Sequence, residues 1–153
     1  MQTDLNIIVA PHDLSYAEAV TAFQLAMAIE TEGLTLDFNK TLRGVQSVLQ
    51  DKAKGRYVLA LVGDKPVASL MLTREWSDWN CCWYLWIQSV YVLPEQRGRG
   101  IFKSMYSKVL EIAKAEGISQ VRLYVDKENQ RAQSVYQKLG MSECHYLMYE
   151  VEL

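Results

Sequence analysis

Arginine and glycine alternate at residues 97–100, between an apolar stretch ending at Leu93 and a helical pattern beginning at Phe102. Glycine lets a backbone approach a phosphate closely, and arginine offers a planar cationic fork. A helix start adds unpaired N–H groups and about half a positive charge. The segment therefore predicts a site for a phosphate-bearing cofactor, with a turn carrying two solvated arginines as the alternative.

Two common phosphate motifs do not fit this segment. A P-loop needs two glycines five residues apart, followed by Lys-Ser or Lys-Thr. Lys103 and Ser104 are present, but Arg97 and Phe102 occupy the glycine positions. A dinucleotide-binding turn needs a third glycine three residues after Gly100, where the sequence has Lys103. Nucleoside triphosphates and NAD-type dinucleotides are therefore poor matches.

A second group of residues shares one face of a short predicted helix. Asn129, Ala132, Tyr136 and Gly140 stand at positions i, i+3, i+7 and i+11. A structural interpretation is available for all four: a capping asparagine, a core alanine, a packed tyrosine and a terminating glycine. In isolation, that interpretation and a functional one are equally plausible.

Together the two segments resemble the acetyl-CoA-binding segments of the GNAT N-acetyltransferase superfamily. Its pyrophosphate loop reads Arg/Gln-x-x-Gly-x-Gly/Ala, which matches residues 97–102 except that Phe102 replaces the small last residue. The strand end at residues 89–95 and the stretch 129–141 are also similar to that family. The resemblance implies acetyl-CoA as cosubstrate, with no metal, bound by Val90, Tyr91, Val92, Arg97, Gly98, Arg99, Gly100, Ile101, Phe102 and Asn129.

The resemblance also implies a role for individual residues. Asn129 would bind the pantetheine arm, Tyr136 would face the sulfur, and a backbone N–H at Val90 or its neighbour would hold the thioester carbonyl. A phenol has a pKa of about 10, so it is protonated at neutral pH and can donate to a departing thiolate. Because Phe102 begins an apolar helical stripe, we expect only its backbone to touch the cofactor.

The implied activity is transfer of an acetyl group from acetyl-CoA to a primary amine by direct attack in a ternary complex. The three cysteines (Cys81, Cys82 and Cys144) have no histidine partner in the sequence pattern that would indicate an acyl-enzyme. The alternative is a non-catalytic module of the same fold that binds or senses acyl-CoA.

The acceptor side is less defined by the sequence. The attacking amine must lose a proton, and Gln88 and Ser89 can only position water for that step. Glu30 and Glu32 are remote candidates for a base, against the alternative of an exposed helix end. Trp79 is a candidate for an aromatic acceptor pocket, together with Trp76, Trp83 and Trp86. Since Trp83 and Trp86 lie on opposite faces of one strand, at least one is expected in the core.

Apolar periodicity predicts the elements that position these residues. Strands are expected at residues 6–10, 57–62, 67–73, 82–92, 121–125 and 145–153, with a loop at 75–80. Helices are expected at residues 16–30, 38–52, 102–115 and 129–139. The resulting class is α/β (α+β): a GNAT-like, mixed and mostly antiparallel sheet, with a right-handed parallel β-α-β crossover and helices on both faces.

Composition limits the other possibilities. A length of 153 residues predicts one domain, residues 1–153, and a net charge of −2 gives no basic surface for nucleic acid. We expect no membrane partner and a cytoplasmic location, because the sequence has neither a long apolar run nor a secretory signal pattern. Only 13 residues follow Gly140, so the acceptor pocket is either open or completed by a second subunit in a homodimer.

Overall fold

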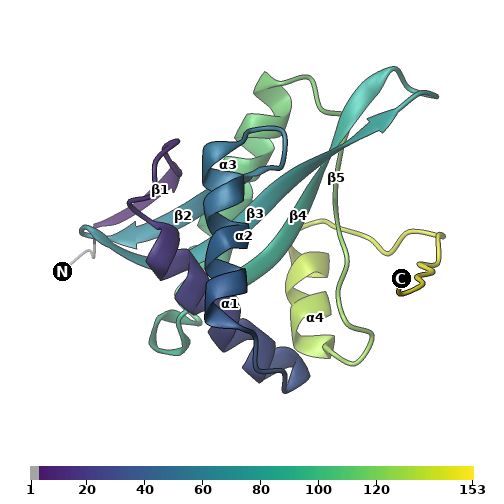
Figure 1. Ribbon diagram of the computed structural model, residues 1–153. Helices are drawn as coiled ribbons and strands as arrows, with labels where there is room; N and C mark the ends of the chain where they lie inside the picture. The colour runs from purple at the N-terminus through teal and green to yellow at the C-terminus, as the bar shows by residue number, and fades with distance from the viewer. Residues whose placement is uncertain (1–3) are drawn as a thin grey trace.

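The computed structural model describes residues 4–153 of the chain, and Figure 1 shows its helices and strands. The strands are β1 (Leu5–Val9), β2 (Arg56–Val62), β3 (Lys65–Ser77), β4 (Cys82–Val92) and β5 (Gln120–Leu123). The helices are α1 (Ala17–Glu32), α2 (Phe38–Gln50), α3 (Ile101–Ala115) and α4 (Gln130–Lys138), with a short 3₁₀ turn, Pro94–Gln96, after β4. Within the described residues, no helix is long and apolar enough to cross a membrane.

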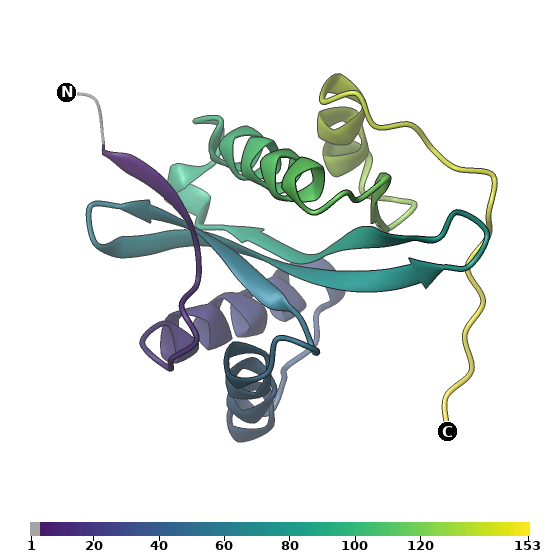
Figure 2. The same ribbon diagram turned by 90° about the horizontal axis from the view of Figure 1, so that it is seen from above.

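The five strands form one sheet in the order β1-β2-β3-β4-β5. The first four strands pair antiparallel, and β5 joins β4 in parallel after the crossover through α3. Figure 2 shows α1 and α2 on one face of the sheet and α3 and α4 on the other. The predicted fold class is therefore confirmed, including the mixed sheet and the helices on both faces.

Each face of the sheet has its own core. On the α3 face, Leu70, Leu72, Leu85 and Met105 belong to one buried cluster. On the α1–α2 face, a second cluster includes Leu59 and others, namely Val20, Val45, Leu49 and Tyr57. Each fully buried aliphatic side chain contributes roughly 1.5–3 kcal/mol. The two cores hold β4, the strand that leads into the candidate loop, between α1 and α3.

The ends of the helices follow from local chemistry. Asp37 caps α2, since its side chain accepts a hydrogen bond of 2.6 Å from the Lys40 amide. Helix α3 begins directly after Gly100, and Ile101, Met105 and Val109 form its buried stripe at a spacing of four residues. The start of α3 is thereby fixed against the sheet.

The prediction of a last strand at residues 145–153 is wrong. Beyond Met141 the described chain forms no helix or strand, and its large apolar side chains are exposed. The segment has a strand-like composition, but a strand exists only when its backbone groups are paired with a neighbour. The loop expected at residues 75–80 is also partly wrong, because β3 continues to Ser77 and pairs with Cys82.

The tryptophan prediction fails as well. Trp83 is 37% exposed and packs edge-to-face on Trp76, with ring centroids 5.1 Å apart. Trp86 is half-buried and lies 6.3 Å from the ring of Tyr124. Neither joins a buried cluster of the described residues, because the outer half of the β3–β4 hairpin extends beyond the helices that cover the rest of the sheet.

Candidate active site

The loop between β4 and α3 has the geometry of an anion site. Gly98 and Gly100 have φ angles of 76° and 75°, in the left-handed region that glycine adopts without steric cost. A Cβ atom at either glycine would meet nothing within 4 Å, so the space beside the loop is open. Within residues 4–153, the amides of Gly98, Arg99 and Gly100 donate to no protein acceptor. Their N–H groups are free for a ligand beside the α3 start.

Arg97 is held by the protein itself. Its Nε donates to the Val92 carbonyl at 2.9 Å, and its two terminal nitrogens form a bidentate pair with Glu30. Its guanidinium also lies 5.6 Å from the centre of the Tyr91 ring. The hydrogen bond from Arg97 lowers the pKa of Glu30, and the same bond raises the pKa of Arg97. Arg97 therefore joins α1 to the loop. Arg99, whose Nη1 donates to Gln96 Oε1 at 3.4 Å, is the exposed arginine beside the two glycines.

This pairing bears on the predicted base. A carboxylate with a lowered pKa, held by two N–H donors, is a weak proton acceptor at neutral pH. Glu32, two residues after Glu30, is the last residue of α1 and is exposed. The structure thus places Glu30 beside the loop, and it leaves Glu32 at an exposed helix end.

Tyr136 and Phe102 are in contact. Their rings meet edge-to-face with centroids 5.6 Å apart, so α4 delivers the tyrosine to the start of α3. Tyr136 is half-buried, and burial raises the pKa of its hydroxyl. The phenol therefore stays protonated at neutral pH. Phe102 also packs against the core cluster, as expected from its place at the head of the apolar stripe.

Asn129 is the cap of α4. Its Oδ1 accepts a hydrogen bond of 3.1 Å from the Ala132 amide. The structural interpretation of this residue therefore holds, and it does not exclude ligand binding. The amide nitrogen of the side chain still has donors to offer, and Asn129 is exposed.

Strand β4 departs from β5 next to the loop. Their parallel pairing ends at Ile87 and Leu123, and immediately afterwards β4 contains a bulge opposite Leu70. Ser89, in the bulge, has a φ of 52°, which is unusual for a residue other than glycine. A bulge bends its strand and leaves one residue out of the ladder. The backbone around Val90 is thus available at the point where the two strands separate.

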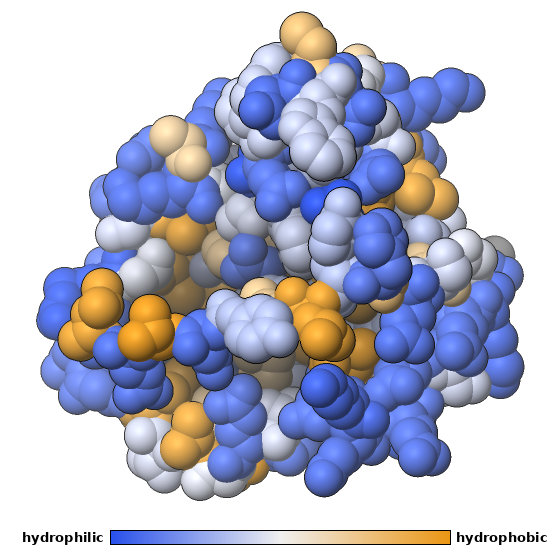
Figure 3. All heavy atoms as spheres, turned by 90° about the vertical axis from the view of Figure 1, so that its right-hand side faces the viewer, coloured by the Kyte–Doolittle hydropathy of each residue, from blue (hydrophilic) through white to orange (hydrophobic). Residues whose placement is uncertain are grey.

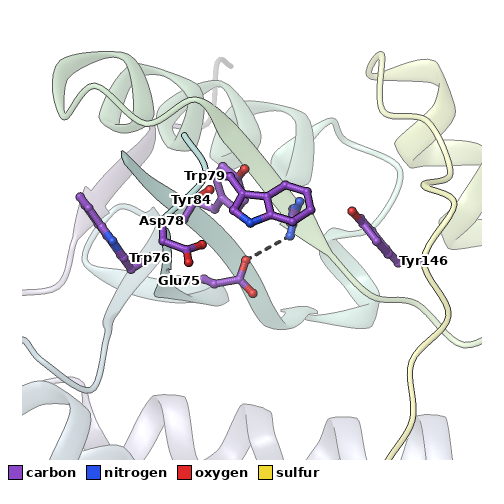
Figure 4. A pocket seen from close by; sticks show the side chains of 8 residues that line it. Glu75, Trp76, Asp78, Trp79, Tyr84 and Tyr146 are labelled. Atoms are coloured by element: carbon purple, nitrogen blue, oxygen red, sulfur yellow. Dashed lines mark hydrogen bonds and ion pairs between the residues drawn. The ribbon is translucent and has the colours of Figure 1, made fainter. Parts of the chain in front are cut away.

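The sheet face covered by α1 and α2 carries polar and aromatic side chains next to the place where β4 and β5 separate. Gln88 donates to the Thr73 hydroxyl at 2.6 Å and is half-buried. Farther out, Arg122 pairs with Glu75 at 3.0 Å and lies over the ring of Tyr84, 4.3 Å from its centre. Figure 4 shows this ion pair inside a shallow hollow, which is lined by Glu75, Trp76, Ser77, Asp78, Trp79, Tyr84, Arg122 and Tyr146.

This hollow is separate from the loop. Tyr84 precedes Gln88 by four residues on β4, which places it about 13 Å farther along the strand. Trp79 lies in the β3–β4 turn and is 89% exposed. The four predicted acceptor-side residues are therefore not brought together: Glu30 lies by the loop, Glu32 at a helix end, Gln88 inside the face and Trp79 at the turn.

Two ion pairs and one backbone conformation of the site could not be predicted from sequence motifs. The Glu30–Arg97 pair joins residues 67 positions apart, and the Arg122–Glu75 pair joins residues 47 apart. The left-handed conformation of Ser89 has no sequence signal, because glycine or asparagine would be expected there.

Comparison with known proteins agrees with this geometry. A family model described as the acetyltransferase (GNAT) family matches residues 22–141. A crystal structure described as a possible acetyltransferase from Clostridium difficile 630 superposes with a TM-score of 0.89. It is 43% identical to this chain, and the match covers 97% of each protein.

Shorter matches connect the chain to enzymes with named substrates. Thialysine N-epsilon-acetyltransferase of Bos taurus is 41% identical over 59 residues, or 39% of this chain and 35% of that protein. Mycothiol acetyltransferase of Beutenbergia cavernae is 36% identical over 56 residues, or 35% of this chain and 19% of that protein. This chain thus spans about a third or less of the length of these relatives.

Proposed function

The chain belongs to the GNAT acetyltransferase family, and we propose that it transfers the acetyl group of acetyl-CoA to a primary amine. One observation carries the choice of donor: the open loop with free amides at Gly98–Gly100 lies directly beside the separation of β4 from β5. Free N–H groups at a helix start suit a pyrophosphate. A gap between strands beside them suits the extended arm that follows the pyrophosphate in CoA.

In this proposal, different residues bind different parts of acetyl-CoA. Gly98, Arg99, Gly100, Ile101 and Phe102 hold the pyrophosphate, all but Arg99 through their backbone alone. Asn129 donates to the pantetheine arm from its side-chain nitrogen. The backbone along Val90, Tyr91 and Val92 lines the arm, and an N–H near Val90 stabilises the oxyanion. Arg97 acts indirectly, because its pairs with Glu30 and Val92 hold the loop.

The reaction then needs one proton donor and one proton acceptor. The amine nitrogen attacks the thioester carbon, the C–S bond breaks, and Tyr136 donates its proton to the sulfur. Support comes from the raised pKa of Tyr136 and from its contact with Phe102 at the α3 start. The amine loses a proton to water positioned by Gln88, since Glu30 is engaged by Arg97. Glu32 remains the alternative acceptor of that proton.

The acceptor is proposed only as a class. A primary amine is common to most GNAT reactions implied by the resemblance, and one relative is named for an N-epsilon position of thialysine. The hollow at the outer end of the β3–β4 hairpin, with Glu75, Asp78 and Trp79, offers carboxylate and aromatic groups to a long cationic acceptor. Arg122 neutralises part of that charge.

A panel of amines tests the proposal. Lysine, thialysine, polyamines, aminoglycosides, amino acids and peptides are incubated with acetyl-CoA, and released thiol is measured. Turnover above the uncatalysed rate with any amine is the expected result. A thermal shift with CoA but no turnover across the panel would favour the acyl-CoA-binding module instead. If CoA gave no thermal shift and no amine gave turnover, the donor assignment would be refuted.

Two further properties are part of the proposal. We place the protein in the cytoplasm, supported by three free cysteines of which Cys81 and Cys144 are exposed, as suits a reducing compartment. We also propose a homodimer, supported by the unpaired segment after Met141. Neither nucleic acid nor membrane is among the proposed partners.

A further inference from the structure

We infer that a cavity at the C-terminal end of α3 binds a small organic anion through its carboxylate or phosphate group. The cavity has a volume of about 590 Å³, which is within the range of small-molecule sites. Its lining includes Val9, Lys52, Gly55, Arg56, Arg74 and Glu116. We call it the distal cavity, because the 15 residues of α3 separate it from the loop at residues 97–100 by about 22 Å.

The strand register explains why charged side chains gather at this place. Arg56 is paired with Leu72, and Arg74 is paired with Leu85, so both arginines lie on the sheet face that carries α3. Farther along the strands the same face is apolar and is buried under α3. Because α3 ends at Ala115, the two arginines line a cavity at its end and do not pack beneath the helix.

The walls of the distal cavity are held by local structure. Gly55 is buried, has a φ of 142° and would place a Cβ atom 2.7 Å from the carbonyl oxygen of Leu72. Only glycine therefore lets the segment between α2 and β2 lie directly against β3. On the side of α2, His12 Nδ1 donates to the Leu49 carbonyl at 2.8 Å, which fixes the imidazole in the lining. The cavity is thus formed before any ligand arrives.

The lining of the distal cavity has an excess of positive charge. It holds three cations, Lys52, Arg56 and Arg74, and one carboxylate, Glu116. The two terminal nitrogens of Arg56 lie 2.6 and 2.8 Å from the two oxygens of Glu116. The hydrogen bond from Arg56 lowers the pKa of Glu116, and the charge of Arg74 adds to that effect, so this carboxylate is ionised at neutral pH. Three positive charges less one negative charge leave an excess of two, from which the C-terminus of α3 subtracts about half a charge.

Lys52 and Arg74 are the cations that a ligand can reach. Within residues 4–153, neither forms a salt bridge with a carboxylate. Arg74 is held in place, because its guanidinium lies over the Trp83 ring, 4.6 Å from the ring centre. A guanidinium stacked on a ring still presents its N–H donors to a carboxylate or a phosphate at its edge. The distal cavity therefore offers one positioned arginine and one flexible lysine to an anion.

Apolar surface alone would not identify a ligand site on this protein. Apolar groups reach the surface in many places, and Figure 3 shows them scattered among polar atoms on the face that it views. The distal cavity differs because it is walled by several elements and because its charges are mostly of one sign. Val9, which is 38% exposed, and the aliphatic stems of the cations supply apolar contacts for the body of an organic anion.

Three compounds with the same ring test this inference: phenyl phosphate, benzoate and the uncharged benzamide. Each is titrated into the isotope-labelled full chain, and the NMR signals of the backbone amides are followed. Saturable shifts at Lys52, Gly55 and Glu116 are expected with phenyl phosphate, with benzoate or with both, and the tighter of the two identifies the preferred head group. No saturable shift at these residues with either anion, or equal binding of benzamide, would overturn the inference. Shifts confined to residues 97–102 would overturn it too, because the anion would then occupy the candidate loop.

Two substitutions in the lining and one outside it complete the test. Arg74→Gln should weaken binding of the anion by roughly tenfold or more, because a hydrogen bond between charged groups is lost. Lys52→Gln should weaken it less, since this side chain is exposed and flexible, and it serves as the measurement if Arg74→Gln does not fold. Arg99→Gln is the matched control, which removes an arginine from the candidate loop and should leave the affinity unchanged. Wild-type affinity in both lining variants would overturn the inference. None of these readouts depends on acetyl transfer, so the inference and the proposed function fail separately.

Discussion

Replacing Glu30 by glutamine tests how the loop is held. The substitution removes the charge from a bidentate pair while keeping the side-chain shape. Both partners are partly exposed, 42% for Glu30 and 30% for Arg97, so solvent screening limits the pair to about 0.5–1 kcal/mol. If that energy serves to order the loop, the KM for acetyl-CoA should rise roughly two- to fivefold, since 1.4 kcal/mol corresponds to a factor of ten. The kcat should stay within about twofold, because Glu30 is not proposed to move a proton.

The assay is steady-state kinetics with varied acetyl-CoA at a saturating amine identified by the panel. The pH dependence of kcat should be the same in Glu30→Gln and in the wild type. Loss of kcat by two or more powers of ten, with loss of an acidic limb in the pH profile, would refute the reasoning and make Glu30 the base. Glu32→Gln is the matched control at the same helix end, with an exposed carboxylate.

The same pair predicts a pH dependence of stability. Because the pKa of Glu30 is lowered in the folded state, its contribution is fully present above the pKa of the unfolded chain, which is about 4.3. It is lost as the pH falls through the lower, folded-state pKa. Wild type and Glu30→Gln should therefore differ in urea midpoint at pH 7 and converge only once the pH has fallen below the folded-state pKa of Glu30. A difference that persists under acid would place the effect outside the ion pair.

Four other substitutions test separate parts of the structure. Tyr136→Phe should lower kcat by roughly two powers of ten with little change in acetyl-CoA KM, as expected for loss of a proton donor, and unchanged turnover would remove Tyr136 from that role. Met105→Ala should cost about 2–5 kcal/mol in urea unfolding, because the side chain is fully buried between α3 and the sheet; a loss under 1 kcal/mol would mean that the site collapses around the change. Gly44→Ala should stabilise the protein by about 0.5–1 kcal/mol, since Gly44 lies inside α2 and an added Cβ meets nothing within 4 Å. Gly100→Ala should do the opposite, because its φ of 75° is strained for alanine.

Much of this fold could be predicted from local patterns. The periodicity of α3 and the length of β4 gave bounds within one residue of those observed, because both elements are long and bury a continuous stripe. The turn at residues 97–100 could be predicted from its two glycines and from the apolar patterns of the strand and helix on either side, while its use as a cofactor site stays a prediction. Its fine geometry could not be found, because the guanidinium of Arg97 faces a helix 67 residues away in the sequence.

The predictions that were wrong share one physical cause. A sequence pattern forms the predicted strand or core only when other parts of the chain pair with it or pack against it. Residues 145–153 have the composition of a strand and form none in the described chain, since a strand needs a neighbouring strand to pair with. Trp83 and Trp86 lie on opposite faces as predicted, but neither is covered by a helix. The four predicted acceptor-side residues lie in different parts of the structure, because residue type alone does not place two side chains together.

The extra residue in β4 also sets which side chains the two cores receive. Before the bulge, the even-numbered Tyr84, Trp86 and Gln88 lie on the α1–α2 face. After it, the odd-numbered Tyr91 stacks on Phe23 of α1, with ring centroids 5.5 Å apart, while Val90 and Val92 pack into the α3 core. Odd-numbered and even-numbered residues of β4 therefore exchange faces at the bulge. If the same residues formed a regular strand without the bulge, Tyr91 would face the α3 core and Val90 and Val92 would face α1, so the extra residue is what allows this sequence to serve both cores.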